Sequence, residues 1–490
     1  MDQKPNMLII QADQHRFDCL GAYGNRDVKT PHIDALAADG VRYENSFCPY
    51  PVCTPSRYSF LSGLYVRQHL GGSNHCTLPA GLPTFPRLLQ REAYRTRAVG
   101  KMHFTPTYLD VGFGKMQLAE QNGAGRYDDD YHRWLRAEGQ THQIDLMDQE
   151  REYRQNAPQE YWDQVGALES DLDEEHHSTT WIAERAVEAL ATWEGGGHLL
   201  MASFIKPHHP FDPPAPWSGM YDPEALTLLP GYTAAPLPRD LAYSRGYFPN
   251  DEMSEGKIRR AMAYYYATIS QIDHQVGRMV QLLKDRGLYD RTLILYNSDH
   301  GEYMGYHHLL LKGNYMYDAL IKVPLIVKYP GQSSAGTVAA DLVNTIDVAP
   351  TLLKQAGCEV PPTMGGLDLA DTAQSRDVVF AESGRGQGYM ARTQTRKLLL
   401  CRDEHQSQFF DLETDPHELE NLYEKADRQQ EIAALKDALM RWVLFDAPYQ
   451  VHVDEQAPII EGENVQRRDD GHREDIYAYF KARMEEGEHL

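Results

Sequence analysis

Cysteine and long apolar runs are scarce in this chain of 490 residues. The six cysteines show no regular spacing, which argues against a disulfide framework. No apolar run approaches the roughly 18 residues of a membrane-spanning helix, so we expect no membrane association. Asn-x-Ser/Thr sequons are absent, and residues 1–10 lack the basic start, long apolar stretch and cleavage site of a signal peptide. These absences predict a cytoplasmic protein.

Positive charge is also in short supply. The chain carries 48 Lys and Arg residues against 71 Asp and Glu residues, which gives a net charge of −23. Because such a surface repels phosphate backbones, we expect no nucleic-acid partner. Solubility is the simplest consequence of this charge. An anionic substrate would need a local cationic pocket that overcomes the surrounding negative field.

Short apolar runs alternate with amphipathic stretches over the first two-thirds of the chain. The apolar runs predict strands, and the amphipathic stretches predict helices. Strands are expected at 6–12, 96–99, 199–205, 292–296 and 324–329, and helices at 31–40, 179–193 and 257–285. Strands separated by helices imply an α/β fold with a large, mostly parallel sheet sandwiched by helices.

The pattern changes near residues 371–376. Short, closely spaced strands are expected beyond this point, followed by a helix, at 377–381, 388–393, 397–402, 408–411 and 429–442. Such spacing is typical of a small antiparallel sheet. We therefore expect a large domain at 1–375, an antiparallel-sheet subdomain at 376–450 and a charged tail at 451–490. The tail is either solvated or an arm that docks on another subunit of a homo-oligomer.

Polar and ionisable residues follow four of the predicted strands, at the end where open parallel sheets bind ligands. In chain order they are Asp13, Gln14, Lys101, His103, His208, Asp299 and His300. The amide, carboxylate and imidazole groups among them are ligands that suit calcium, magnesium or manganese. Loop residues that only hydrogen-bond locally are the alternative.

The most specific segment is Cys53-Thr54-Pro55-Ser56-Arg57, which is followed by Gly63. Pro55 suits the start of a helix and Gly63 its end. Cys53 would then lie at the positive end of a helix dipole, where an anion is stabilised. A small buried apolar side chain is the alternative for a lone cysteine.

This segment resembles the sulfatase signature, Cys-x-Pro-Ser-Arg followed by a glycine six residues later. Further segments match the sulfatase family before and after this signature, in the family's order. They lie at 30–34, 93–96, 100–103, 204–211, 298–302, 312, 323–325, 410–412 and 415–418. Because ordered matches extend over most of the chain, the sequence is identified as a member of the formylglycine-dependent sulfatases, in the alkaline-phosphatase-like superfamily.

The resemblance implies a modified residue and a metal. Cys53 would be oxidised to formylglycine, whose hydrate is the nucleophile, by a formylglycine-generating or sulfatase-maturating enzyme. Asp13, Gln14, Asp299 and His300 would hold one divalent cation, usually Ca²⁺, beside the modified Cys53.

The resemblance also implies the residues that handle the substrate. Arg57 would orient the hydrate, and Lys101 and Lys312 would bind the sulfate oxygens. His103 would deprotonate the second hydroxyl of the hydrate, which expels sulfate and restores the aldehyde. A serine ester would lack that hydroxyl and stay trapped. His208 would protonate the leaving alcohol.

Two positions depart from the commonest sulfatase pattern. Gln14 stands where most members have Asp, and His300 where most have Asn. These residues look more like choline sulfatase and the phosphonate monoester hydrolases, so Mn²⁺ or Mg²⁺ becomes an alternative to Ca²⁺. Gln14 is either a direct ligand or lies behind the ligands. Phosphonate monoester or phosphodiester hydrolysis becomes a rival function, although residues 100–103 remain sulfatase-like.

The favoured function is hydrolysis of an aryl, alkyl or sugar sulfate monoester to an alcohol and inorganic sulfate. A protein that only binds sulfated ligands is a further alternative. A cytoplasmic location favours a small sulfated molecule or a fragment of a sulfated glycan as the substrate. Residues 105–175 and 211–250 are expected to be loops. Long loops at the carboxyl ends of strands commonly carry substrate contacts, but an ordinary solvated loop is the simpler account of 105–175.

Overall fold

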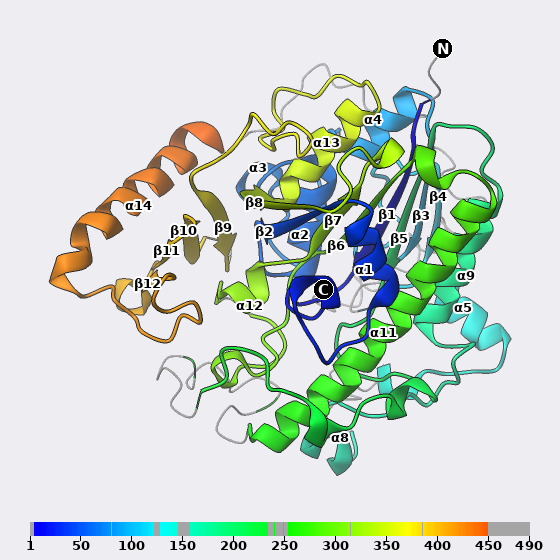
Figure 1. The fold of residues 1–490 in the computed structure, drawn as a ribbon, viewed down its shortest axis with the longest axis horizontal. Coiled ribbons are helices and arrows are strands. Elements are labelled where there is room, and N and C mark those ends of the chain that lie inside the picture. Colours follow the sequence, from blue (N-terminus) through cyan, green and yellow to red (C-terminus); the bar gives the residue numbers. More distant parts are fainter. Residues whose placement is uncertain are drawn as a thin grey trace, which may run out of the picture.

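The computed structural model describes residues 4–79, 81–121, 128–145, 157–233, 240, 248, 253–313, 315–384 and 386–448 (Figure 1). The predicted tail at 451–490 lies outside the described residues. None of the described helices has an apolar stretch that could span a bilayer.

The larger sheet has eight strands in the order β4-β3-β5-β1-β6-β7-β2-β8. They are β1 (Asn6–Ala12), β2 (Val41–Phe47), β3 (Arg95–Gly100), β4 (Lys115–Leu118), β5 (His198–Phe204), β6 (Thr292–Ser298), β7 (Leu325–Lys328) and β8 (Thr337–Asn344). Neighbouring strands are parallel except at β7, which is antiparallel to both β6 and β2. The predicted large, mostly parallel sheet is confirmed.

The strand β1 lies at the centre of this sheet and is buried on both faces. Met7 and Ile9 belong to the apolar core on one side, and Leu8 and Ile10 to the core on the other. A strand that is covered on both faces can be apolar at successive positions. This explains why the run was visible in the sequence.

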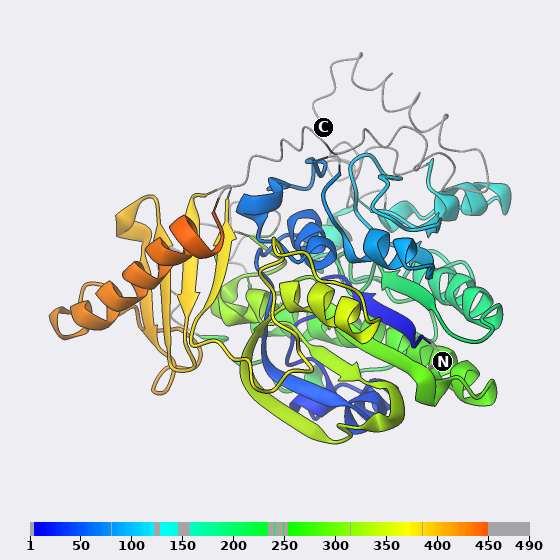
Figure 2. The ribbon, with the colours of Figure 1, turned by 90° about the horizontal axis from the view of Figure 1, so that it is seen from above.

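Helices cover both faces of the sheet (Figures 1 and 2). The core that holds Met7 is packed by α2 (Cys53–Ser62), α4 (Phe85–Arg91) and α13 (Val348–Gln355). The opposite core is packed by α1 (Pro31–Ala38), α9 (Ser178–Ala191) and the long α11 (Glu255–Asp285). Shorter helices are α3 (Val66–His69), α5 (Asp130–Ala137), α8 (Gln159–Asp163) and α12 (Asp318–Ile321).

A separate antiparallel sheet stands beside the larger one, at the left of Figure 1. Its order is β12-β11-β10-β9, from β9 (Val379–Ser383), β10 (Gly388–Arg392), β11 (Arg396–Cys401) and β12 (Gln408–Asp411). The helix α14 (Gln429–Arg441) packs on it. The predicted small antiparallel sheet is confirmed, whereas the boundary between 375 and 376 stays a prediction.

A buried ion-pair network ties the small sheet to the larger part. Lys397 Nζ lies 2.8 Å from Asp318 Oδ1 and 2.6 Å from Glu418 Oε1. Glu418 also accepts a hydrogen bond from Tyr306 Oη at 3.0 Å. Lys397 and Glu418 are fully buried, so loss of either partner would leave an uncompensated charge in the interior. The network therefore favours the observed placement of the small sheet against the larger part.

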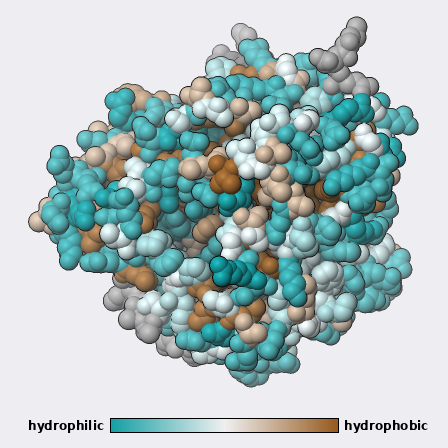
Figure 3. Space-filling model, in the orientation of Figure 1, coloured by the Kyte–Doolittle hydropathy of each residue, from teal (hydrophilic) through white to brown (hydrophobic). Residues whose placement is uncertain are grey.

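Some elements differ from the sequence-based expectation. The strands β2, β4 and β8 were not predicted, and residues 105–175 are more than loop, since they contain β4, α5 and α8. β2 reads Val-Arg-Tyr-Glu-Asn-Ser-Phe, and the first half of the edge strand β8 is largely exposed. Neither presents the continuous apolar run that reveals a buried strand. The face in Figure 3 is mainly hydrophilic, with apolar residues in small separate groups.

Trp442 directly follows α14 and packs against rings from both the small sheet and the larger part. Its indole stacks on Phe380 at 5.0 Å between ring centroids and meets Tyr65 edge-on at 4.9 Å. We expect Trp442→Ala to destabilise the protein by about 3–5 kcal/mol, since it removes a fully buried ring. Thermal unfolding measures this loss. Met440→Ala on the same helix is the control, because Met440 is 55% exposed; an equal shift in both variants would contradict the prediction.

Candidate active site

Four parallel strands end side by side at one edge of the larger sheet. β3, β5, β1 and β6 are consecutive neighbours, so the residues that follow them meet. Lys101 Nζ, after β3, lies 2.9 Å from Asp13 Oδ2, after β1. Asp299 follows β6, and His208 lies beyond the end of β5. The sheet therefore gathers ionisable groups from distant parts of the sequence into one buried site.

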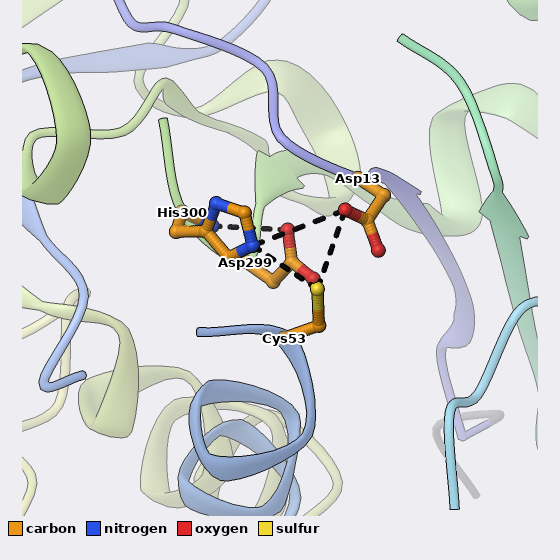
Figure 4. Close-up of side chains that lie close together, drawn as sticks. All are labelled: Asp13, Cys53, Asp299 and His300. Atoms are coloured by element: carbon orange, nitrogen blue, oxygen red, sulfur yellow. Dashed lines mark hydrogen bonds and ion pairs between the residues drawn. The ribbon is translucent and has the colours of Figure 1, made fainter. Parts of the chain in front are cut away.

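Cys53 lies at the centre of this site, as the first residue of α2, and is fully buried. Its Sγ lies 3.2 Å from His300 Nε2 and 3.7 Å from Asp13 Oδ1. Asp13, Cys53, Asp299 and His300 each offer one ligand atom, and these atoms lie within 4.8 Å of one another (Figure 4). Gly63 ends the helix in the left-handed conformation, with φ of 66°.

This donor set fits a divalent cation. His300 Nδ1 lies 2.9 Å from the carbonyl oxygen of Gly301, so its N–H donates there and Nε2 faces the cluster, where the neutral imidazole would offer it as a ligand atom. Burial raises the pKa of Asp299, and the nearby Asp13 raises it further. A dication would relieve this repulsion between two buried carboxylates.

Arg57 joins the two carboxylates. Its Nε donates to Asp299 Oδ2 at 2.8 Å and its Nη2 to Asp13 Oδ2 at 3.0 Å. Its Nη1 donates to the carbonyl oxygen of Lys101 at 2.6 Å. Burial acts to raise the pKa of Asp13, but Lys101 and Arg57 hold that pKa well below its usual range. Arg57 therefore fixes the position and the charge of the candidate metal ligands.

Lys312 also contacts the sulfur atom of Cys53. Its Nζ lies 2.9 Å from Cys53 Sγ and 2.7 Å from His208 Nε2. Because an ammonium group only donates, His208 Nε2 accepts, and Nδ1–H donates to the carbonyl oxygen of His209. Burial and, after it, Lys312 lower the pKa of His208 to about 3. The imidazole is therefore neutral here, and the proton between the two side chains resides on Lys312.

His103 follows β3 in an unusual backbone conformation. Its φ is 57°, in the left-handed region, and its carbonyl oxygen accepts a hydrogen bond from Thr54 Oγ1 at 2.7 Å. Burial lowers the pKa of His103, and Lys101 lowers it further. An imidazole that stays uncharged near neutral pH is able to accept a proton.

The site is cationic although the whole chain is acidic. Burial acts to raise the pKa of the Cys53 thiol, but Lys312, His300 and Lys101 hold that pKa well below its usual range. The same charges stabilise any other anion placed at this helix start. This is the local positive pocket that an anionic substrate of an acidic protein requires.

Gln14 lies beside the cluster and contacts three of its neighbours. Its backbone N–H donates to Asp299 Oδ1 at 3.1 Å, its Nε2 donates to Glu302, and its Oε1 accepts from Lys312 at 3.0 Å. Every predicted site residue is thus in or next to the cluster. Glu302 was not among them, although its place two residues after His300 was a usable signal.

A second missed residue is Glu120, which is buried and accepts hydrogen bonds from the backbone of the turn after β3. No sequence signal pointed to it, because it follows the unpredicted strand β4. The structure thus adds two buried glutamates to the expected site.

Comparison with known proteins agrees with this geometry. A family model described as Sulfatase matches residues 5–358, which is more than half of the chain. The chain belongs to the sulfatase family. A second model, N-sulphoglucosamine sulphohydrolase, C-terminal, matches residues 305–443 of the sulfatase. The sulfatase is therefore assigned to the sulfuric ester hydrolases.

Individual relatives support the same assignment. The sulfatase is 30% identical over 479 residues to an arylsulfatase of Clostridium perfringens, covering 89% of this chain and 94% of the relative. It is 28% identical over 438 residues to a choline-sulfatase of Rhizobium meliloti, covering 86% and 83%. The crystal structure of a phosphonate monoester hydrolase of Agrobacterium radiobacter shares the fold of the sulfatase, with a TM-score of 0.74 at 24% identity, covering 89% of this chain and 95% of that one.

Proposed function

We propose that the sulfatase hydrolyses a sulfate monoester of an aryl, alkyl or sugar alcohol through a formylglycine formed from Cys53. The observation that carries this proposal is the position of Cys53. It begins α2, contacts Lys312 at 2.9 Å and faces His300 at 3.2 Å. A nucleophile at this point would meet an anionic ester among positive charges, which lower the barrier to attack.

We propose Asp13, Gln14, Asp299 and His300, with the modified position 53, as the ligands of one divalent cation. Ca²⁺ is the first candidate because most of these donors are oxygens. The imidazole of His300 makes Mn²⁺ or Mg²⁺ the alternatives. A bound cation would neutralise charge on the sulfate oxygens and polarise the S–O bond.

In the proposed first step, Lys101 and Lys312 hold the sulfate oxygens. One hydroxyl of the hydrate passes its proton to Asp299, whose carboxylate lies within 4.8 Å of Cys53 Sγ, and its oxygen forms the bond to sulfur. The bond from sulfur to the alcohol oxygen breaks, and that oxygen takes a proton. We assign this proton to the pair of His208 and Lys312, whose nitrogens are 2.7 Å apart. The sulfuryl group is then attached to position 53.

In the proposed second step, His103 accepts the proton of the remaining hydroxyl. The C–O bond to sulfate breaks, its electron pair leaves with the sulfate, and a carbonyl forms. Water then regenerates the hydrate. Arg57 takes part by holding Asp13 and Asp299, and we propose that it orients the hydrate through them.

The proposed partners follow from this chemistry. A formylglycine-generating or sulfatase-maturating enzyme would oxidise Cys53, and the substrate would be a small sulfated molecule or a fragment of a sulfated glycan. A cytoplasmic location is part of the proposal. All six cysteines are free in the structure, which agrees with a reducing compartment.

The proposal predicts a preference for sulfur over phosphorus. With one 4-nitrophenol leaving group on both substrates, we expect kcat/KM for the sulfate ester to exceed that for the phosphonate monoester by at least about tenfold, which is about 1.4 kcal/mol in the barrier. Steady-state kinetics of the metal-loaded enzyme measure both constants. A preference for the phosphonate would favour the rival function, phosphonate monoester or phosphodiester hydrolysis. Gln14, His300 and the shared fold are the observations that support this rival.

Intact-mass analysis of the peptide at 50–67 separates the enzyme from a protein that only binds sulfated ligands. Oxidation of the thiol to the aldehyde lowers the peptide mass. An unmodified cysteine in protein from the native host would favour the binding protein.

A further inference from the structure

The backbone of His103 is held at both of its polar groups. Its N–H lies 3.0 Å from Glu120 Oε1 and 3.1 Å from Oε2, and its carbonyl oxygen accepts from Thr54 Oγ1 at 2.7 Å. The preceding N–H, of Met102, donates to Glu120 Oε1 at 2.9 Å. The carboxylate of Glu120 therefore accepts hydrogen bonds from two successive amides, and the hydroxyl of Thr54, next to Cys53, donates to the carbonyl oxygen of His103.

Glu120 is itself fixed in place. It is 2% exposed, and its own N–H donates to Asp129 Oδ2 at 3.0 Å. Asp129 also caps α5, where its Oδ1 accepts from the N–H of His132 at 2.8 Å. Glu120 follows the edge strand β4, which pairs with β3 up to Gly100. The strand thus delivers the carboxylate to the turn that carries His103.

This support matters because the turn is strained. A residue with a side chain rarely adopts a positive φ, and such a conformation persists only when its surroundings enforce it. Without the two acceptor oxygens, the amides of Met102 and His103 would be buried without these partners, and the turn would relax. The imidazole would then leave its place beside position 53.

We propose that Glu120 is a positioning residue that sets His103 for the release of sulfate from position 53. This inference rests on the proposed function, in which His103 takes the proton of the second hydroxyl while the C–O bond to sulfate breaks. Attack on the ester depends on Lys101, Lys312 and His208 instead. Loss of Glu120 should therefore slow the second step far more than the first.

The test compares Glu120→Met with Glu120→Gln in metal-loaded enzyme whose Cys53 conversion is verified by mass. Met keeps the length of the side chain and removes both acceptors, whereas Gln keeps one oxygen that can serve both amides. For Glu120→Met we expect a burst of about one equivalent of alcohol, then turnover slowed by about 10- to 100-fold, the usual penalty for a misplaced catalytic group. Both kcat and KM should fall together, so that kcat/KM stays nearly unchanged.

Mass analysis during turnover should show Glu120→Met enzyme carrying one additional SO₃ group, and Glu120→Gln should restore turnover without a burst. Glu382→Met is the matched control, because buried Glu382, in β9 of the small sheet, accepts a hydrogen bond from the N–H of Arg67 at 2.8 Å. It should lower stability without a burst. If Glu120→Met does not fold, Thr54→Val removes the second hold on His103 and should give the same burst, with Thr54→Ser as its rescue.

Two results would overturn the inference. One is a fall in kcat/KM for Glu120→Met with no burst and no sulfated enzyme, and the other is equal behaviour of the Met and Gln variants. Failure of the proposed function looks different, because the fully converted wild-type enzyme would then leave sulfate esters intact.

Discussion

Replacement of Cys53 by alanine should reduce kcat on a sulfate ester by about 10⁵-fold, in the range seen when the nucleophile of an enzyme is removed. Alanine cannot become an aldehyde, and no other group replaces the hydrate. Lys101 and Lys312 remain, so the variant should still bind the ester. Steady-state kinetics give the loss in turnover, and competition by the variant for a limiting amount of substrate gives the binding.

The matched control is Cys48→Ala. Both thiols are fully buried, but burial raises the pKa of Cys48, whereas Lys312, His300 and Lys101 outweigh burial at Cys53 and lower its pKa. Cys48→Ala should keep its turnover. Comparable losses in the two variants would show that the effect at position 53 is structural.

A serine at position 53 would give a different result. If it stays unconverted, its single hydroxyl can accept the sulfuryl group once, but no second hydroxyl is present to expel it. We expect less than one turnover and a stable sulfated protein. Repeated turnover by an unconverted Cys53→Ser variant would disprove release through a hydrate.

Lys312→Met should lower kcat/KM by about 10²- to 10³-fold, as expected for the loss of one charge that stabilises the transition state. Lys312 contacts position 53 and His208. Because a neighbouring cation disfavours protonation, removal of Lys312 should raise the pKa of His208 from about 3 toward its usual value. Kinetics measure the first effect, and an NMR titration of His208 measures the second.

Lys328→Met is the control for this variant. Lys328 is a buried lysine whose Nζ donates to the carbonyl oxygen of Thr292 at 3.1 Å. Thr292 begins β6, so this contact lies at the opposite end of the strand from Asp299 and the site. Its loss should affect stability but not kcat/KM. A fall in kcat/KM for Lys328→Met as large as that for Lys312→Met would remove the case for a specific role of Lys312.

The site could be predicted largely because its residues follow strands that the sequence reveals. β1, β5 and β6 are buried along their whole length. Their apolar runs mark both the strand and the point where it ends. Asp13, His208 and Asp299 could therefore be placed at a common edge before the fold was known.

Other parts could not be predicted, for identifiable physical reasons. The direction of β7 depends on the connection that precedes it, and apolar composition does not report direction. Glu120 lacks a nearby motif, and it becomes part of the site only because β4 pairs with β3. The partners of Arg57 are two carboxylates that lie 44 and 242 residues away in the sequence. Such contacts arise from tertiary packing, and local patterns do not contain them.

The burial of Cys53 also bears on how the protein is made. In the folded chain its side chain is 0% exposed, beneath residues that come from as far along the sequence as Lys312. An oxidising enzyme would therefore meet an accessible thiol only on a nascent or incompletely folded polypeptide. If Cys53 is converted as proposed, maturation would compete in time with folding, and a chain that folded first would keep the unmodified thiol.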